Sequence, residues 1–143
     1  MQSEYNALLE IDQLKSIYRN TYISDGSRRE NSAEHSWHLA LALMILDTHI
    51  PPEVNRPHMI LMALTHDICE IGSGDVPIYS PERGKQVQAE ADYMRHFAES
   101  FGPFGSSTRE LWQEYEAQET PESRWVMLAD RVLPFILNLA AEG

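Results

Sequence analysis

The sequence predicts an all-α helical bundle, and three observations support that prediction. Apolar residues recur at three- and four-residue spacing along most of the chain, and N-cap and proline signals open several of these segments. Runs of strict alternation, which are typical of half-buried strands, are missing. With 143 residues, 43% of them hydrophobic and 23% charged, the chain suits one globular domain over 1–143 with a substantial core.

The first half of the chain contains two predicted helices with a polar stretch between them. Apolar residues at helical spacing predict a helix over 4–19, and the Asp-Gly pair at 25–26 predicts a turn after it. Asn31 and Glu34 are three residues apart, which is typical of a capping box. The helix that they open, over about 32–49, is apolar on most sides, so we expect it to lie at the centre of the bundle.

The second half continues the pattern of helix after helix. We expect a helix over about 57–71, a helix over 80–101 that begins at a serine followed by proline, and a short helix over 108–117 after the "GPFGSS" break. The last helix is expected over 121–140, with a kink at Pro134 because proline removes a helical hydrogen bond.

The charge and the cysteine content limit which partners the protein can bind and which cellular compartment it suits. The formal net charge is −11, from 22 acidic and 11 basic residues, which argues against a nucleic acid polymer as partner because that needs a cationic surface. No apolar stretch is long enough to span a membrane, and no secretory signal is visible. Cys69, the single cysteine, excludes an internal disulfide framework, so we expect a cytoplasmic protein.

The segment "HDICEIGSGDVP" turns polar directly after an apolar helix. A polar group in a buried place costs a few kcal/mol, about 2 to 7, unless it is paired or bound to something. At about 100° per helical residue, His66, Asp67 and Glu70 fall on neighbouring parts of one helix surface. His35 and Asp130 each lie on an apolar stripe of another predicted helix, so three helices direct ligand-capable groups inward.

Each of these residues also has an ordinary explanation when it is taken alone. His35 could be a hydrogen-bonded core histidine, and Asp130 could pair with a basic neighbour. The imidazole of His66 could lie at a helix C-terminus, where the negative end of the helix dipole favours it. Taken together they favour one buried divalent metal ion, because such an ion satisfies two imidazoles and two carboxylates at once.

The ordered set of His35, then His66-Asp67, then Asp130 resembles the HD-domain metal-dependent phosphohydrolases. Four stretches narrow the resemblance to the small HD hydrolases typified by bacterial 5′-deoxynucleotidases: "RRENSAEHSWHLAL", "HDICEIGSGDVP", "ELWQEYE" and "PESRWVMLADRV". The similarity extends from about Leu14 to the last predicted helix, which is most of the chain.

The resemblance implies a role for each of nine residues. Four are implied ligands of one divalent ion (Mn, Co, Fe, Ni, Zn or Mg): His35, His66, Asp67 and Asp130. Glu70 is expected to orient the attacking water, and Asp75 to protonate the leaving oxygen or to hold the sugar. Arg19 is expected to contact the phosphate, with Arg28 or Arg29 as further candidates.

The expected function is release of phosphate from (deoxy)nucleoside 5′-monophosphates by a homodimer. Two alternatives stay open: hydrolysis of another small phosphorylated metabolite or phosphodiester, and a non-catalytic protein that a metal stabilises. The sequence departs from the family pattern at Asn20, where the deoxynucleotidases have tryptophan. Family members also usually continue past the last ligand helix, so we expect the C-terminal extension to be absent from this chain, which stops at Gly143.

Overall fold

The computed structural model describes residues 1–73, 81 and 83–142, and within them it confirms the predicted all-α bundle. One small antiparallel hairpin accompanies the helices. In chain order the elements are α1 (Gln2–Asp12), η1 (Gln13–Ser16), β1 (Tyr18–Tyr22), β2 (Arg29–Asn31), α2 (Ser32–Ile45), η2 (Asp47–His49), α3 (Arg56–Thr65), α4 (Glu70–Ser73), α5 (Arg83–Ser100), α6 (Gly102–Ala117) and α7 (Pro121–Glu142).

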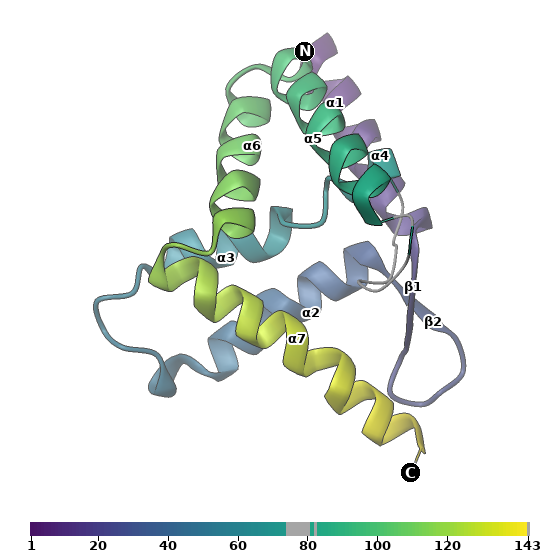
Figure 1. The fold of residues 1–143 in the computed structure, drawn as a ribbon, viewed down its shortest axis with the longest axis vertical. Coiled ribbons are helices and arrows are strands. Elements are labelled where there is room, and N and C mark those ends of the chain that lie inside the picture. The colour runs from purple at the N-terminus through teal and green to yellow at the C-terminus, as the bar shows by residue number, and fades with distance from the viewer. Residues whose placement is uncertain (74–80, 82, 143) are drawn as a thin grey trace.

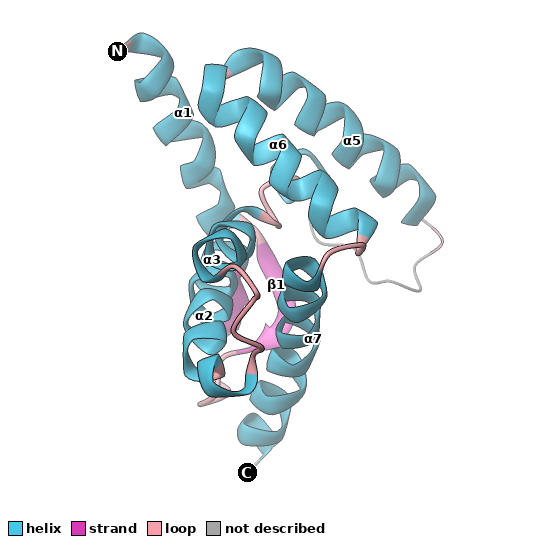
Figure 2. Ribbon diagram, turned by 90° about the vertical axis from the view of Figure 1, so that its left-hand side faces the viewer, coloured by secondary structure: helices cyan, strands magenta, loops and turns pink. Residues whose placement is uncertain are grey.

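The helices form two groups, each with its own apolar cluster. Helices α2, α3 and α7 pack together around buried residues such as Leu39 and Val126, while α5 and α6 lie side by side with α1 nearby and bury Phe97 and Trp112 (Figures 1 and 2). The segment 66–69 leads from the first group to the second. A site built on this segment therefore lies where the two groups meet.

The predicted capping box at the start of α2 is present. The Asn31 side chain accepts a hydrogen bond from the Glu34 backbone amide at 2.9 Å, and the Glu34 carboxylate accepts one from the Asn31 amide at 3.0 Å. These bonds satisfy amides that a helix start otherwise leaves unpaired. They define the first turn of the helix that carries His35.

The predicted helix over 4–19 is wrong in its second half. Helix α1 ends at Asp12, and after the 3-10 segment η1 the chain enters β1, which pairs with β2. Two tyrosines and a threonine favour a strand in 18–22, and the predicted turn lets this strand fold back. Gly26 adopts a φ of 73°, a conformation that glycine tolerates without strain.

The helix expected over 57–71 is interrupted. Helix α3 ends at Thr65, and from Ile68 onward the backbone amides bond to carbonyls three residues back, as in Ile68 N to Thr65 O at 3.1 Å and Glu70 N to Asp67 O at 2.9 Å. Since such a turn has about three residues instead of 3.6, Glu70 does not lie at the angle to His66 that a continuous α-helix predicts.

Helix α6 begins earlier than expected, whereas α7 begins at the expected residue, Pro121. Helix α6 begins at Gly102, six residues earlier than expected, because a proline in the first turn needs no backbone N–H there. A Cβ atom on Gly105 would lie 2.5 Å from the Phe97 carbonyl oxygen, so this glycine permits the close packing of α6 on α5. Helix α7 continues through Pro134 to Glu142, and Ser80, the expected N-cap of the helix over 80–101, lies outside the described residues.

Within the ranges that the structure describes, no helix combines the length and the apolar character that crossing a membrane requires.

Candidate metal centre

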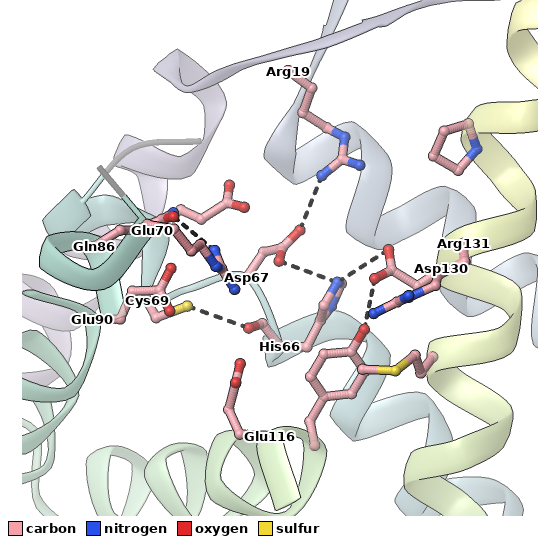
Figure 3. Close-up of a pocket in the computed structure, with 14 residues that line it drawn as sticks. Arg19, His66, Asp67, Cys69, Glu70, Gln86, Glu90, Glu116, Asp130 and Arg131 are labelled. Carbon is pink, nitrogen blue, oxygen red and sulfur yellow. Dashed lines mark hydrogen bonds and ion pairs between the residues drawn. The ribbon is translucent and has the colours of Figure 1, made fainter. Parts of the chain in front are cut away.

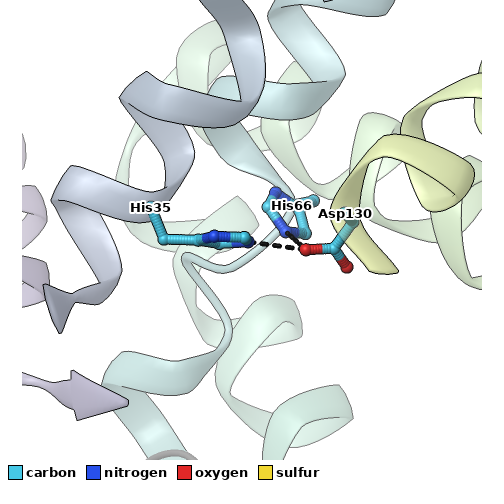
Figure 4. A group of neighbouring side chains, drawn as sticks. All are labelled: His35, His66 and Asp130. Carbon is cyan, nitrogen blue, oxygen red and sulfur yellow. Dashed lines mark hydrogen bonds and ion pairs between the residues drawn. The ribbon is translucent and has the colours of Figure 1, made fainter. Parts of the chain in front are cut away.

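Three ligand-capable side chains converge from three helices. His35 comes from α2, His66 follows α3 directly, and Asp130 comes from α7 (Figure 4). One ligand atom of each lies within 4.8 Å of the others. His35 Nε2 is 2.5 Å and His66 Nε2 is 3.6 Å from the same oxygen, Oδ1 of Asp130. The structure thus brings together the residues that the sequence places on separate helices.

His66 is held in the tautomer that a metal ligand needs. Its Nδ1 donates a hydrogen bond to the Ala63 carbonyl oxygen at 2.8 Å, which leaves Nε2 as the coordinating nitrogen. The side chain is buried, and among the described residues no hydrogen-bond partner reaches Nε2. A buried nitrogen without a partner is costly, so a bound divalent ion fits this position.

Asp67 completes a set of two imidazoles and two carboxylates. Its Oδ1 is 3.2 Å from His66 Nε2 and its Oδ2 is 3.9 Å from His35 Nε2. Mixed imidazole and carboxylate donors suit Mn, Co, Fe, Ni or Zn ions. The four predicted ligands are therefore neighbours in space, and three of them, His35, His66 and Asp130, offer donor atoms that all lie within 4.8 Å of one another.

The charge states of these groups depend on each other. Burial alone would lower the pKa of His66, but the charge of Asp67 and the carboxylate of Asp130 raise it well above its usual value. Burial would also lower the pKa of His35, but the carboxylates of Asp130 and Glu30 raise it above its usual value. Burial would raise the pKa of each aspartate, but the adjacent imidazoles hold both pKa values below the usual range. Without a metal, the centre is thus stabilised as imidazolium–carboxylate pairs.

Arg19 and Glu30 support the centre from the hairpin. Arg19 Nε donates to Glu30 Oε1 at 3.0 Å, and its Nη1 donates to Asp67 Oδ2 at 3.4 Å. The same Glu30 oxygen is 3.5 Å from His35 Nδ1. Both side chains are largely buried, so the hairpin that the sequence did not predict contributes directly to the site.

Glu70 lies beside the centre and lines the same cavity. Its Oε2 accepts a hydrogen bond from Ser32 Oγ at 2.7 Å, and both side chains are buried. The cavity has a volume of about 440 Å³ (Figure 3). Its lining residues are Arg19, His66, Asp67, Cys69, Glu70, Arg83, Gln86, Glu90, Tyr115, Glu116, Met127, Asp130, Arg131 and Pro134.

The structure does not bring every predicted site residue to this cavity. Arg28 pairs with Glu34, at 2.7 Å between Nη2 and Oε1, and Arg29 donates to the Arg19 carbonyl oxygen at 2.5 Å. Neither side chain lines the cavity. Asp75, the expected acid or sugar ligand, lies outside the described residues.

Several residues of the site were missed by sequence reasoning. Tyr115 donates its hydroxyl hydrogen to Asp130 Oδ2 at 2.6 Å, and its ring centroid is 5.0 Å from that of His66. Its motif, "ELWQEYE", was part of the resemblance, but nothing in the motif says which helix the tyrosine contacts. Glu30 was equally hidden, because its role depends on the pairing of two short strands.

The comparisons with known proteins agree with this geometry. The family model for the HD domain matches residues 11–143, which is nearly the whole chain. The chain belongs to the HD-domain family. The predicted resemblance is thereby confirmed at the level of the family, and the paired His66-Asp67 of this HD domain lies at the centre of its candidate site.

Curated relatives of this HD domain are named 5′-deoxynucleotidase HDDC2. The protein from Bos taurus is 26% identical over 125 residues, which cover 85% of this chain and 59% of the relative. The protein from Danio rerio is 28% identical over 129 residues, covering 85% of this chain and 61% of the relative. This HD domain therefore spans about three fifths of the length of these relatives.

A solved structure with a very similar fold is that of a predicted metal-dependent phosphohydrolase from Magnetospirillum magnetotacticum. It is 35% identical, with a TM-score of 0.91, and the match covers 99% of this HD domain and 71% of that chain. An HD-domain phosphohydrolase from Listeria innocua is 25% identical, with a TM-score of 0.68 and coverage of 90% and 64%.

Proposed function

We propose that this HD domain is a metal-dependent phosphohydrolase that releases phosphate from nucleoside 5′-monophosphates. The observation that carries the proposal is the buried group of His35, His66 and Asp130, with Asp67 beside it, at a cavity that Glu70 and Arg19 also line. A metal that only stabilised the fold would need neither the cavity nor Glu70.

The reaction needs a better nucleophile than neutral water and a way to offset the charge of the phosphate. A divalent ion held by His35, His66, Asp67 and Asp130 would lower the pKa of water and neutralise phosphoryl charge. The remaining tasks are those of the chain itself: orienting the water, binding the phosphate and supplying a proton to the leaving oxygen.

Glu70 is proposed to orient the attacking water and accept its proton. The Ser32 hydroxyl holds one carboxylate oxygen of Glu70 in place at 2.7 Å, and the side chain lines the cavity beside Asp67. A carboxylate with a fixed orientation is suited to this task because general base catalysis requires the acceptor within hydrogen-bond reach of the water.

Arg19 is proposed to bind the phosphate. Its guanidinium is anchored by Glu30 and Asp67 at the cavity, and the surrounding carboxylates raise its pKa although burial opposes them. An anchored guanidinium loses little freedom when it binds an anion. Asp75 remains our candidate for protonating the leaving oxygen or binding the sugar.

The names of the relatives favour a nucleotide as substrate. Proteins named 5′-deoxynucleotidase share 24–28% identity with this chain. The resemblance to the bacterial 5′-deoxynucleotidases implies tryptophan at the position of Asn20, so we expect ribonucleotides and deoxyribonucleotides to be hydrolysed at similar rates. Another small phosphorylated metabolite is the alternative substrate, and a homodimer is the assembly that we expect.

The decisive experiment is a phosphate-release screen. Metal-stripped protein would be given each candidate ion in turn and tested on ribo- and deoxyribonucleoside monophosphates. We expect turnover only with added metal, and a Glu70→Gln variant that keeps its metal but loses about 100-fold or more in kcat.

The matched control for this variant is Glu53→Gln, which changes an exposed glutamate far from the cavity lining and should keep full activity. Full turnover by Glu70→Gln with metal bound would rule out the role proposed for Glu70. A purified protein that binds none of the ions would overturn the mechanism as a whole.

A further inference from the structure

One wall of the cavity is built from side chains that the proposed reaction does not use. Glu90 comes from α5 and Glu116 from α6, and Gln86 lies one helical turn before Glu90. Figure 3 shows Gln86 and Glu90 on the opposite side of the cavity from Asp130 and Arg131. Glu90 therefore lies across the cavity from Asp130, and Glu116 lines the same cavity.

Keeping the Glu90 carboxyl group buried in this wall is unfavourable for folding. Glu90 is only 6% exposed. Burial, and then the neighbouring charge of Glu116, raise the pKa of Glu90 to about 7, and burial likewise raises the pKa of Glu116. A buried carboxyl group such as that of Glu90 is costly unless it has partners, so its place in this wall calls for an explanation, whereas Glu116 is exposed and adds negative charge at the cavity.

Side chains of the chain itself satisfy part of the hydrogen-bonding capacity of the two carboxyl groups. Ser73 forms a hydrogen bond with the Glu90 carboxylate, and the positive charge of Arg83 acts on both Glu90 and Glu116. Arg83 Nη1 also donates to Gln86 Oε1 at 2.7 Å. A carboxylate offers about four acceptor positions, so one serine bond leaves acceptor capacity on Glu90 for a ligand in the cavity.

The opposite side of the cavity carries two arginines near the aspartates of the candidate metal centre. Arg19 and Arg131 line it beside the metal centre, where a phosphate would be bound. On the other side, Arg83 offsets part of the negative charge of Glu90 and Glu116, and the two carboxyl groups attract hydroxyl and amino groups as hydrogen-bond donors. The cavity is therefore suited to a molecule with one phosphate end and one donor-bearing end.

We propose that Glu90 and Glu116 form a second subsite, which accepts hydrogen bonds from hydroxyl or amino groups at the end of the substrate away from the phosphate. The proposal rests on the proposed function and deepens it, because it names what selects the substrate beyond its phosphate. In a nucleotide, the donor is either a sugar hydroxyl or the amino group of the base.

The test compares substrates with and without these donors. Wild type, Glu90→Gln, Glu90→Ala and Glu116→Ala would be assayed with AMP, IMP, dAMP, 2′,3′-dideoxy-AMP and para-nitrophenyl phosphate, which has neither sugar nor base. We expect the alanine variants to lose 10-fold or more in kcat/KM on AMP, mainly through KM, with less than a 3-fold change on para-nitrophenyl phosphate. Glu90→Gln, which keeps an acceptor oxygen, should lose less.

The two sources of the donor give different patterns. If the base amino group binds here, wild type prefers AMP over IMP and the variants lose that preference. If the sugar hydroxyls bind here, wild type prefers AMP and dAMP over 2′,3′-dideoxy-AMP, and the variants lose that preference. An equal loss on all substrates, including para-nitrophenyl phosphate, would overturn the subsite, since it would indicate a structural role.

Controls separate this proposal from the proposed function. Glu99→Gln and Glu110→Gln alter exposed glutamates of the same two helices and should change nothing. Calorimetric binding of adenosine, which carries no phosphate, tests the subsite without turnover. Loss of adenosine binding in Glu90→Ala would support the subsite even if no phosphatase activity were found, and unchanged binding would contradict it.

Discussion

The two ring nitrogens of His66 have different surroundings. Nδ1 donates to the Ala63 carbonyl oxygen, while Nε2 lies 3.2 Å from Asp67 and 3.6 Å from Asp130 without a hydrogen-bond partner among the described residues. His35 has a carboxylate near each nitrogen, Glu30 at 3.5 Å and Asp130 at 2.5 Å. Each imidazole therefore directs one nitrogen toward the centre, and a carbonyl oxygen outside the centre orients the other nitrogen of His66, an arrangement known to tune metal ligands.

Tyr115 is expected to position Asp130 for metal binding. A Tyr115→Phe variant would remove the 2.6 Å hydrogen bond to Asp130 Oδ2 and leave the ring in place beside His66. Because partners that orient a ligand contribute about 10- to 100-fold to metal affinity, we expect the Kd for Mn²⁺ or Co²⁺ to rise by at least 10-fold. Titration of stripped protein against a competing chelator would measure the change.

Tyr93→Phe is a matched control for that experiment. It removes a hydroxyl hydrogen bond of similar length, 2.7 Å to Glu10, at a position that does not line the cavity. Its metal affinity should equal that of wild type. If Tyr115→Phe bound the metal as tightly as Tyr93→Phe, the contact with Asp130 would have no effect on the centre.

The candidate metal ligands could be predicted from the sequence, whereas the residues that hold these ligands in place could not. His35 and Asp130 stand on apolar helical stripes, so the periodicity alone indicates that they point inward. Glu30 lies on a short strand and Tyr115 on the buried face of α6, but their roles arise only when separate elements pack together. Contacts between distant elements leave no local pattern in a single sequence.

At the scale of elements, helix existence was easier to predict than helix ends. Caps and periodicity correctly predicted α2 and α7, whereas 4–19 and 57–71 were each expected as one helix. Both errors have a physical cause. The first segment gains a strand partner, with Tyr18 opposite Asn31 and Tyr22 opposite Arg29. The second segment tightens after His66 into turns whose amides bond to carbonyls three residues back.

The capping box of α2 should contribute measurably to stability. An Asn31→Ala variant would lose the hydrogen bond to the Glu34 amide, and we expect the free energy of unfolding to fall by about 1 kcal/mol, measured by urea denaturation. Because α2 begins at Ser32, which bonds Glu70, this variant should also raise KM or lower kcat modestly.

Asn138→Ala is the control, because Asn138 is an exposed residue of α7 away from the helix start and alanine has the higher helix propensity. Its stability should match or slightly exceed that of wild type. Equal stability of both variants would show that the capping box does not stabilise this helix.

At the scale of the whole molecule, the candidate metal centre lies where the two helical groups meet. Its ligands belong to α2, to the segment after α3 and to α7, while Glu70, Glu90 and Glu116 approach from the side of α4, α5 and α6. A metal bound here would crosslink three segments that are distant in sequence, and ligands that bind only the folded state stabilise it. The stability of the molecule should therefore depend on both metal and pH.

The metal-free protein should lose stability as the pH rises above about 6.5. The folded-state pKa values of His35 and His66 lie above the value of about 6.5 expected in the unfolded chain, so their contribution is fully present below that pH and is lost as the pH rises through the folded pKa values. Asp67 and Asp130, with lowered pKa values, contribute above about pH 4 and lose this contribution as the pH falls further. We expect the Tm of stripped protein to fall between pH 6.5 and 8.5.

Added metal should reverse this trend, because coordination requires neutral imidazoles and so competes with protons. The rise in Tm caused by Mn²⁺ or Co²⁺ should grow between pH 6 and 8, as thermal unfolding at each pH would measure.

Asp130→Asn removes the carboxylate beside both imidazoles, so its metal-free Tm should vary less over the same interval. A metal-free wild-type Tm that increased from pH 6.5 to 8.5 would contradict the charge pairing derived from the structure, whereas a metal effect that ignored pH would contradict coordination through the histidines.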